Sequence, residues 1–203
     1  NALKHTRTRR YALPEYTELY NALSVRLNSM LGPHKQALIP AYREKTSFGD
    51  MDIVYDGPRL SVDDVEREFS PNEIVKNGDV ISFNYDQLQI DLINTKTFDY
   101  SLCYFSYNDL GNLIGKLARR AGLKHGHNGL FLPLRLAEHY QVDIPVTTDY
   151  SAALEFLDLS PERFRQGFDT LQDIFDYVAG SRYFNPDAYK LENLNNIARV
   201  RDR

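Results

Sequence analysis

The chain has 203 residues, which is enough for one sizeable hydrophobic core or two small ones. Hydrophobic residues make up 42% and charged residues 26% of it, an ordinary globular composition that excludes extensive disorder. The net charge of −4 argues against a surface that wraps nucleic acid indiscriminately. We interpret the short basic runs at 4–10 and 199–203 as solvated ends.

The sequence carries no sign of a membrane or secretory location. No run approaches the roughly 18–20 apolar residues that a membrane helix needs, and the first residues lack the apolar core of a signal peptide. The single cysteine, Cys103, cannot form a disulfide within the chain, and its apolar surroundings suit a small buried residue. We therefore expect a cytoplasmic protein that does not associate with membranes.

The first half of the chain predicts a small mixed sheet with helices. The expected elements are a helix over 14–31, a strand over 36–39, a strand over 50–56, a helix over 61–69 and two tightly joined strands over 80–85 and 88–93. Pro14 and the pair Gly32-Pro33 bound the first helix. Ser61 and Asp64 have the spacing of a capping box and mark the start of the second.

The second half predicts mainly helices. The expected elements are helices over 98–105 and 108–121, a turn between two short strands within 124–131, an ambiguous segment over 135–144, and helices over 150–157, from 160, over 171–179 and over 186–200. His125 and His127 could bind a metal, but the glycine-rich turn and the lack of a third nearby ligand favour two solvated histidines. The predicted fold class is α+β, with a small mixed sheet, flanking helices and a mainly helical C-terminal lobe.

Two acidic residues follow a glycine at the start of the strand predicted over 50–56. Because side chains alternate across a strand, Asp50 and Asp52 should lie side by side on one face. Two carboxylates held that close repel each other, and a divalent cation is the usual compensation. Mg²⁺ takes its oxygen ligands from carboxylates and substrate phosphates, and the nearby Arg43 and Lys45 suit phosphate.

A third carboxylate lies in the strand predicted over 88–93. Asp91 shares a face with Gln89, while Ile90 and Leu92 point the other way into apolar surroundings. Burying an unpaired carboxylate there would cost several kcal/mol. Three carboxylates around two Mg²⁺ or Mn²⁺ ions would explain it, with one ion activating the attacking oxygen and the other stabilising the leaving oxygen.

These features, in this order, resemble the catalytic core of the nucleotidyltransferase superfamily, and specifically its DNA polymerase beta-like branch (family X). The stretches 49–52 (Gly-Asp-Met-Asp) and 89–92 (Gln-Ile-Asp-Leu) are similar to the family's acidic strands. Weaker similarities follow at 98–106, 112–123, 129–131 and 153–162. The resemblance covers about residues 39–165. It implies an N-terminal helical segment (1–35), a palm (36–96), a nucleotide-selection subdomain (97–165) and C-terminal helices of unknown role (166–203).

The resemblance also implies roles for individual residues. Asp50, Asp52 and Asp91 would be catalytic and hold two metal ions, and Lys116 would contact a nucleic-acid template strand. The residues expected to bind nucleotide are Arg43, Lys45, Ser47, Gly49, Tyr104, Phe105, Asp109 and Asn112. Two alternatives stay open for the last four of these. Tyr104 and Phe105 equally suit a core aromatic pair, and Asp109 and Asn112 suit the first turn of a helix.

The expected function is transfer of a nucleoside monophosphate from an NTP or dNTP to a hydroxyl, with a nucleic-acid 3′ end as the acceptor. One alternative keeps this chemistry but modifies a tRNA, a protein or a small molecule. Another is a catalytically degenerate binding or scaffold protein. The observation that favours this scaffold alternative is Ile39-Pro40, which occupies the position of the family's Gly-Ser phosphate cradle. Proline has no N–H to donate to a phosphate. Tyr107 likewise replaces a family glycine beside the sugar and base.

Overall fold

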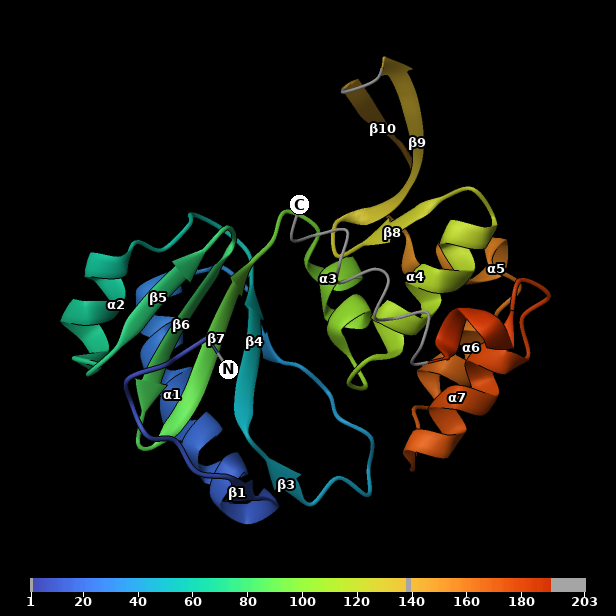
Figure 1. Ribbon diagram of the computed structural model, residues 1–203. Helices are drawn as coiled ribbons and strands as arrows, with labels where there is room; N and C mark the ends of the chain where they lie inside the picture. The colour runs from blue at the N-terminus through green and yellow to red at the C-terminus, as the bar shows by residue number, and fades with distance from the viewer. Residues whose placement is uncertain (1, 138–139, 191–203) are drawn as a thin grey trace.

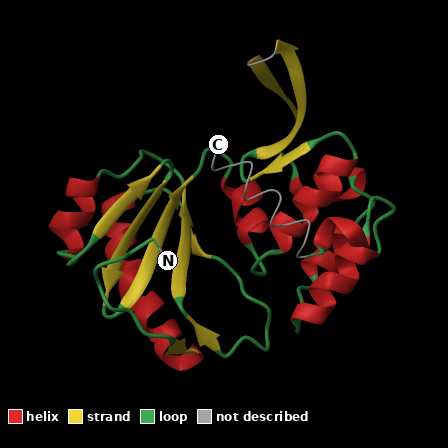
Figure 2. Ribbon diagram, in the orientation of Figure 1, coloured by secondary structure: helices red, strands yellow, loops and turns green. Residues whose placement is uncertain are grey.

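The computed structural model describes residues 2–137 and 140–190 (Figures 1 and 2). The helices are α1 (Leu13–Leu31), α2 (Val62–Phe69), α3 (Phe98–Phe105), α4 (Leu110–Arg120), α5 (Tyr150–Phe156), α6 (Pro161–Arg165), α7 (Leu171–Ala179) and the 3-10 helix η1 (Pro186–Tyr189). The strands are β1 (Tyr11–Ala12), β2 (Gln36–Leu38), β3 (Ser47–Phe48), β4 (Asp50–Tyr55), β5 (Ile74–Asn77), β6 (Val80–Tyr85), β7 (Leu88–Asn94), β8 (Lys124–Gly126), β9 (Gly129–Ala137) and β10 (Tyr140–Thr147). Within these described ranges, no helix has both the length and the apolar character to cross a bilayer.

The first half of the chain builds on a five-stranded sheet in the order β2-β4-β7-β6-β5. Neighbouring strands run antiparallel except β4 and β7, which pair in parallel. Helix α1 lies across one face of the sheet (Figure 1). Its buried Leu23 and Leu27 share one hydrophobic core with Met51 and Ile53 of β4 and Ile90 of β7. We call this part the sheet lobe.

The second half has a hydrophobic core of its own, formed mainly by α3 to α7. We call it the helical lobe. Tyr100 of α3, Leu117 of α4 and Leu154 of α5 are buried in this core, as are Phe168 and Val178 further along. A three-stranded sheet, β10-β9-β8, joins the lobe, and the antiparallel β9–β10 ribbon projects away from the helices (Figure 1).

The two lobes are tied together on one side by the loop over 40–45. The backbone N–H groups of Arg43 and Glu44 donate to the carbonyl oxygens of Phe168 and Asp169, at 2.9 Å each. Tyr107 N–H donates to the Pro40 carbonyl at 2.7 Å. The loop therefore bridges the sheet and the helical lobe beside the C-terminal end of α3.

The α+β class is confirmed, and most predicted elements are present. The Ser61 capping box forms as expected, with Ser61 Oγ accepting from Asp64 N–H at 3.1 Å. The ambiguous segment over 135–144 lies within the β9–β10 ribbon wherever it is described. Of the helix expected over 186–200, the described part is the short 3-10 helix η1, and 191–200 lies outside the described residues. Strands β1, β3 and β5 were not predicted.

Candidate active site

Parallel pairing of β4 with β7 brings the acidic residues together. In that register Asp52 lies opposite Asp91, and Asp50 lies opposite Gln89. Met51 and Ile53 of β4 face the other side of the sheet, as do Ile90 and Leu92 of β7. All four are fully buried, as the alternation of the sequence predicts. The apolar face fixes the register, and the register fixes the spacing of the carboxylates.

The three carboxylates line one cavity of about 400 Å³ between the lobes, which we call the acidic pocket. The sheet forms its floor. Lys45 from the bridging loop lines one side, and Phe105 and Asp109 line the helical-lobe side. Pro40, at the start of the loop, is also part of the wall. The pocket is therefore built by both lobes and by the loop that joins them.

Burial and mutual repulsion make the Asp52 and Asp91 carboxylates of the acidic pocket harder to ionise. Burial, with the charges of Asp91 and Asp50 adding to it, raises the pKa of Asp52 to about 7. Burial also raises the pKa of Asp91, although hydrogen bonds from Ser82 and Gln89 oppose the rise. The Gln89 amide donates to both Asp91 oxygens, at 3.1 and 3.0 Å. Asp91 is therefore held in place by its neighbour on the same strand.

The donor set suits a hard divalent cation such as Mg²⁺ or Mn²⁺. Carboxylate oxygens are the ligands these ions prefer, and a cation would relieve the repulsion that raises the pKa of Asp52. As the side chains stand, no group of three His, Cys, Asp or Glu residues in the described parts of the chain is arranged to hold a metal ion. The chemistry of Asp50, Asp52 and Asp91 thus fits such ions, and their side chains would have to move to complete the coordination.

Lys45 is the cation that lines the pocket. Burial lowers the pKa of its ammonium group, whereas the charges of Asp50 and Asp52 oppose that shift. Its Nζ lies 3.4 Å from Asn108 Oδ1 of the helical lobe and 5.0 Å from the ring centroid of Phe48. Lys45 is therefore positioned between the acidic strand and the helical lobe.

Arg10 is a second cation near the site, and the sequence reasoning missed it. Pairing of β1 with β3 brings it to Ser47, where its Nε donates to Oγ at 2.7 Å and its Nη2 to the carbonyl at 2.8 Å. A Cβ placed on Gly49 would lie 3.0 Å from Arg10 Nη1, so a larger residue there would press on the guanidinium. Ser47 and Gly49 are thus occupied in seating Arg10 beside β4.

The segment that carries Arg10 is largely exposed, as interpreted from the sequence, but its backbone is anchored to the sheet lobe. The carboxylate of Glu73 accepts hydrogen bonds from the backbone N–H groups of Lys4, His5 and Thr6, at 2.7 to 2.9 Å. These bonds lower the pKa of Glu73 to about 2. The basic run itself was the available signal, but nothing in the sequence indicated where it is anchored.

Arg43, expected to hold the triphosphate, is directed elsewhere. Its guanidinium forms an ion pair with Asp169 and donates to the Gln166 carbonyl, both in the helical lobe. It does not line the acidic pocket and instead borders a neighbouring cavity. Arg43 therefore reinforces the bridge between the lobes in this conformation.

The four expected helical-lobe ligands divide into two pairs. Phe105 and Asp109 line the acidic pocket, whereas Tyr104 packs beside His125, with ring centroids 4.9 Å apart. Asn112 lies one helical turn after Asp109 and donates to its carboxylate at 3.5 Å. Lys116 lies further along α4 and lines a different cavity.

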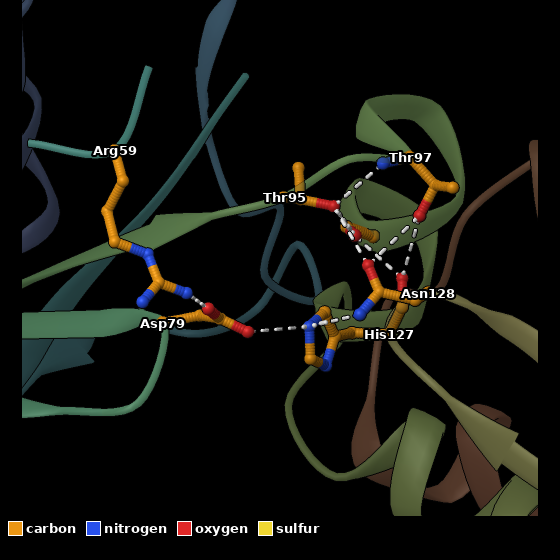
Figure 3. Close-up of polar contacts among 7 residues, drawn as sticks. Arg59, Asp79, Thr95, Thr97, His127 and Asn128 are labelled. Atoms are coloured by element: carbon orange, nitrogen blue, oxygen red, sulfur yellow. Dashed lines mark hydrogen bonds and ion pairs between the residues drawn. The ribbon is translucent and has the colours of Figure 1, made fainter. Parts of the chain in front are cut away.

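Of the two histidines expected to be solvated, His125 is buried and His127 is partly exposed. His125 is buried, which lowers its pKa to about 4, so it is neutral at physiological pH. His127 lies where the helical lobe meets the sheet lobe, and its Nε2 is 3.8 Å from a carboxylate oxygen of Asp79 (Figure 3). Arg59 forms an ion pair with the same carboxylate. We call Arg59, Asp79 and His127 the hinge cluster. The His127 ring stacks on Phe105, with ring centroids 5.6 Å apart, which connects this cluster to the pocket wall.

Comparison with known proteins adds no assignment. No family profile matches the chain, and no curated protein matches its sequence significantly.

Proposed function

We propose that the chain is a divalent-cation-dependent nucleotidyltransferase of the DNA polymerase beta-like kind, which moves a nucleoside monophosphate from an NTP or dNTP to a hydroxyl group. The observation that carries the proposal is the β4–β7 register, because it puts Asp52 opposite Asp91 in a pocket that Asp50 also lines. A cavity with three carboxylates, a lysine and one aromatic wall suits a phosphate-bearing nucleotide better than an apolar ligand.

The charged residues in and beside the pocket have distinct parts in the proposed reaction. Asp50, Asp52 and Asp91 would hold the cations, which supply charge neutralisation and activation of the attacking oxygen. The hydroxyl oxygen bonds to the α-phosphorus, its proton leaves to the Asp91 carboxylate, and the bond to pyrophosphate breaks. Lys45 offsets the charge on the triphosphate, with Arg10 nearby. The Gln89 amide supports this role by orienting Asp91.

The proposed acceptor is a nucleic-acid 3′ end, and the proposed location is the cytoplasm. Phe105 would face the sugar and Asp109 the base, since both reach the pocket from the helical lobe. Pro40 lines the same pocket and has no N–H to offer a phosphate, so the lysine and arginine carry that task here.

The test is transfer of radiolabel from each α-labelled NTP and dNTP, with Mg²⁺ or Mn²⁺, to a DNA primer, an RNA primer, a tRNA pool or the protein itself. We expect label on a nucleic-acid primer. Asp91→Asn should lower the rate by about 10²- to 10⁴-fold, as expected for loss of a general base. Glu66→Gln, an exposed carboxylate on α2, is the matched control and should transfer at the wild-type rate.

The same experiment separates the alternatives. Label found only on tRNA or on protein would keep the chemistry and replace the acceptor. Transfer by Asp91→Asn at the wild-type rate would remove Asp91 from the site. Absence of transfer to every acceptor, together with absence of metal-dependent nucleotide binding, would leave a scaffold protein and overturn the proposed function.

A further inference from the structure

A second cavity lies at the far end of α4, away from the acidic pocket. Its volume is about 410 Å³, and mostly apolar atoms form its wall. Lys116, Arg119 and Arg120 of α4 line one side, Tyr183 and Tyr189 line the other, and the carboxylate of Asp187 is also part of the wall. We call it the α4 pocket. It combines aromatic surface with three cations, and nothing in the proposed transfer reaction uses it.

The three cations of the α4 pocket outnumber Asp187, the one carboxylate among the described residues that line it, and Asp187 forms an ion pair with Lys190. Among the residues described, neither Arg119 nor Arg120 forms an ion pair or a side-chain hydrogen bond. Burial and the neighbouring Arg119 both lower the pKa of Lys116, as expected where positive charges crowd together. Residues at positions i, i+3 and i+4 share one helix face, so these charges point the same way. The pocket therefore favours an anion.

The aromatic side of the pocket is already fixed in place. Tyr189 Oη donates to the Leu113 carbonyl at 3.1 Å, and the Tyr189 ring stacks on Phe184 at 5.1 Å. Lys116 Nζ donates to the Ala188 carbonyl at 3.0 Å and lies 4.4 Å from the Tyr189 ring centroid. A flat ligand would meet a wall that needs little ordering, which favours binding.

We propose that the α4 pocket binds a nucleotide of a single-stranded nucleic acid, with its base against the tyrosines and neighbouring phosphates on Arg119 and Arg120. Aromatic walls beside cations are the arrangement that binds single strands without reading sequence. The identification of this strand as the acceptor rests on the proposed function, whereas strand binding itself does not.

The geometry of α4 sets the length of strand that both pockets would share. Asp109, just before the helix, lines the acidic pocket, and Arg120 at its end lines the α4 pocket. At 1.5 Å per residue the two positions are about 16 Å apart along the helix. Stacked nucleotides rise about 3.4 Å each, so about five nucleotides span the distance. A strand shorter than this should not reach both pockets.

The test is fluorescence anisotropy with labelled oligothymidylates of about 3 and about 12 nucleotides, a range set by the site sizes of single-strand-binding folds. It uses the full chain without metal or triphosphate. We expect the longer strand to bind more tightly. The double variant Arg119→Ala/Arg120→Ala should weaken its binding at least tenfold and reduce the slope of log affinity against log salt by about 1.4, which corresponds to two lost contacts. Arg165→Ala, an exposed arginine on α6, should change neither.

Two further variants are measured in the same binding experiment. Tyr183→Ala should weaken the longer strand at least fivefold through lost stacking, provided that its thermal unfolding matches the wild type. Asp91→Asn should bind the strand as the wild type does, so that failure of transfer and failure of strand binding stay distinguishable. The proposal is overturned if the wild type binds no oligonucleotide, if the double arginine variant binds like Arg165→Ala, or if a free mononucleotide competes as well as the strand.

Discussion

The two pockets lie near opposite ends of α4 and differ in how their charges are held. The acidic pocket takes Asp52 and Asp91 from two paired strands whose other faces are fully buried. The α4 pocket takes its cations from one face of a helix, where Lys116 alone is anchored by a side-chain hydrogen bond to another described residue. The acidic groups are therefore fixed by the core, and the cost is a raised pKa. This difference suits chemistry that needs exact placement in one pocket and adaptable contact with phosphates in the other.

The largest effect is expected where α4 packs on α3, because both pockets depend on that contact. A Cβ on Gly111 would overlap the Tyr104 carbonyl oxygen, so Gly111→Ala should destabilise the protein by about 3 kcal/mol. Gly115, one turn later, has no atom within 4 Å of such a Cβ, and Gly115→Ala should stabilise by about 0.5–1 kcal/mol. Urea unfolding of both variants measures the difference. Equal behaviour of the two would mean that α4 is free to shift on α3.

An intermediate effect is expected from the buried carboxylates of the metal-free protein. The pKa of Asp52 in the folded chain, about 7, lies above its ordinary value of 3.8, so the folded state holds this proton more tightly than the unfolded state. Its contribution to the free energy of unfolding is therefore greatest below about pH 4 and is lost as the pH rises through about 7. Asp52→Asn should remove that loss, on the order of 2 kcal/mol or a few degrees in Tm at pH 8.

The measurement is the difference in Tm between wild type and Asp52→Asn across pH 4 to 8, in chelator. Taking the difference cancels groups such as Glu73, whose pKa shifts the other way. Added Mg²⁺ should raise the Tm of the wild type at pH 8 and leave the variant nearly unchanged. A Tm difference that does not depend on pH would show that Asp52 titrates normally.

The smallest effect is expected at the hinge cluster, where the contacts are polar and partly exposed. The Arg59 side chain is 49% exposed and that of its partner Asp79 37%. Arg59→Ala should therefore cost no more than about 1 kcal/mol. Thermal unfolding followed by circular dichroism measures it, with Arg67→Ala, at the more exposed ion pair with Asp64 on α2, as the control. A cost above about 2 kcal/mol would mean that the hinge cluster holds the lobes together.

The sequence predicts best what local pattern decides. The alternation of Ile90, Asp91 and Leu92 fixes a strand with one acidic and one apolar face, and the structure has that strand with Ile90 and Leu92 fully buried. Ser61 caps its helix because the cap is a contact three residues long. Both predictions depend only on residues close together in the sequence, and the structure confirms both.

Features that depend on distant partners were missed or misplaced. Arg10 reaches the site through a two-residue strand pair with β3, too short to leave a periodic pattern. His125 is buried by helices that come before and after it, so its turn-like sequence suggested exposure wrongly. Arg43 lies opposite Asp169, 126 residues later, and no local pattern records that pairing. The acidic groups were predictable because they share two strands, and Lys45 was predictable because it lies close to Asp50 in the sequence. Arg10 was missed because a separate segment brings it to the site.

The β4–β7 pairing also bears on how the chain reaches its native state. Asp52 and Asp91 are paired neighbours in the sheet, although α2, β5 and β6 separate them in the sequence. A slip of one residue in β4 would turn Met51 and Ile53 out of the core and drive both of its carboxylates into the apolar layer under α1. Misregistered chains would thus be heavily penalised during folding. The carboxylates that repel one another in the folded protein would therefore also disfavour incorrect strand registers during folding.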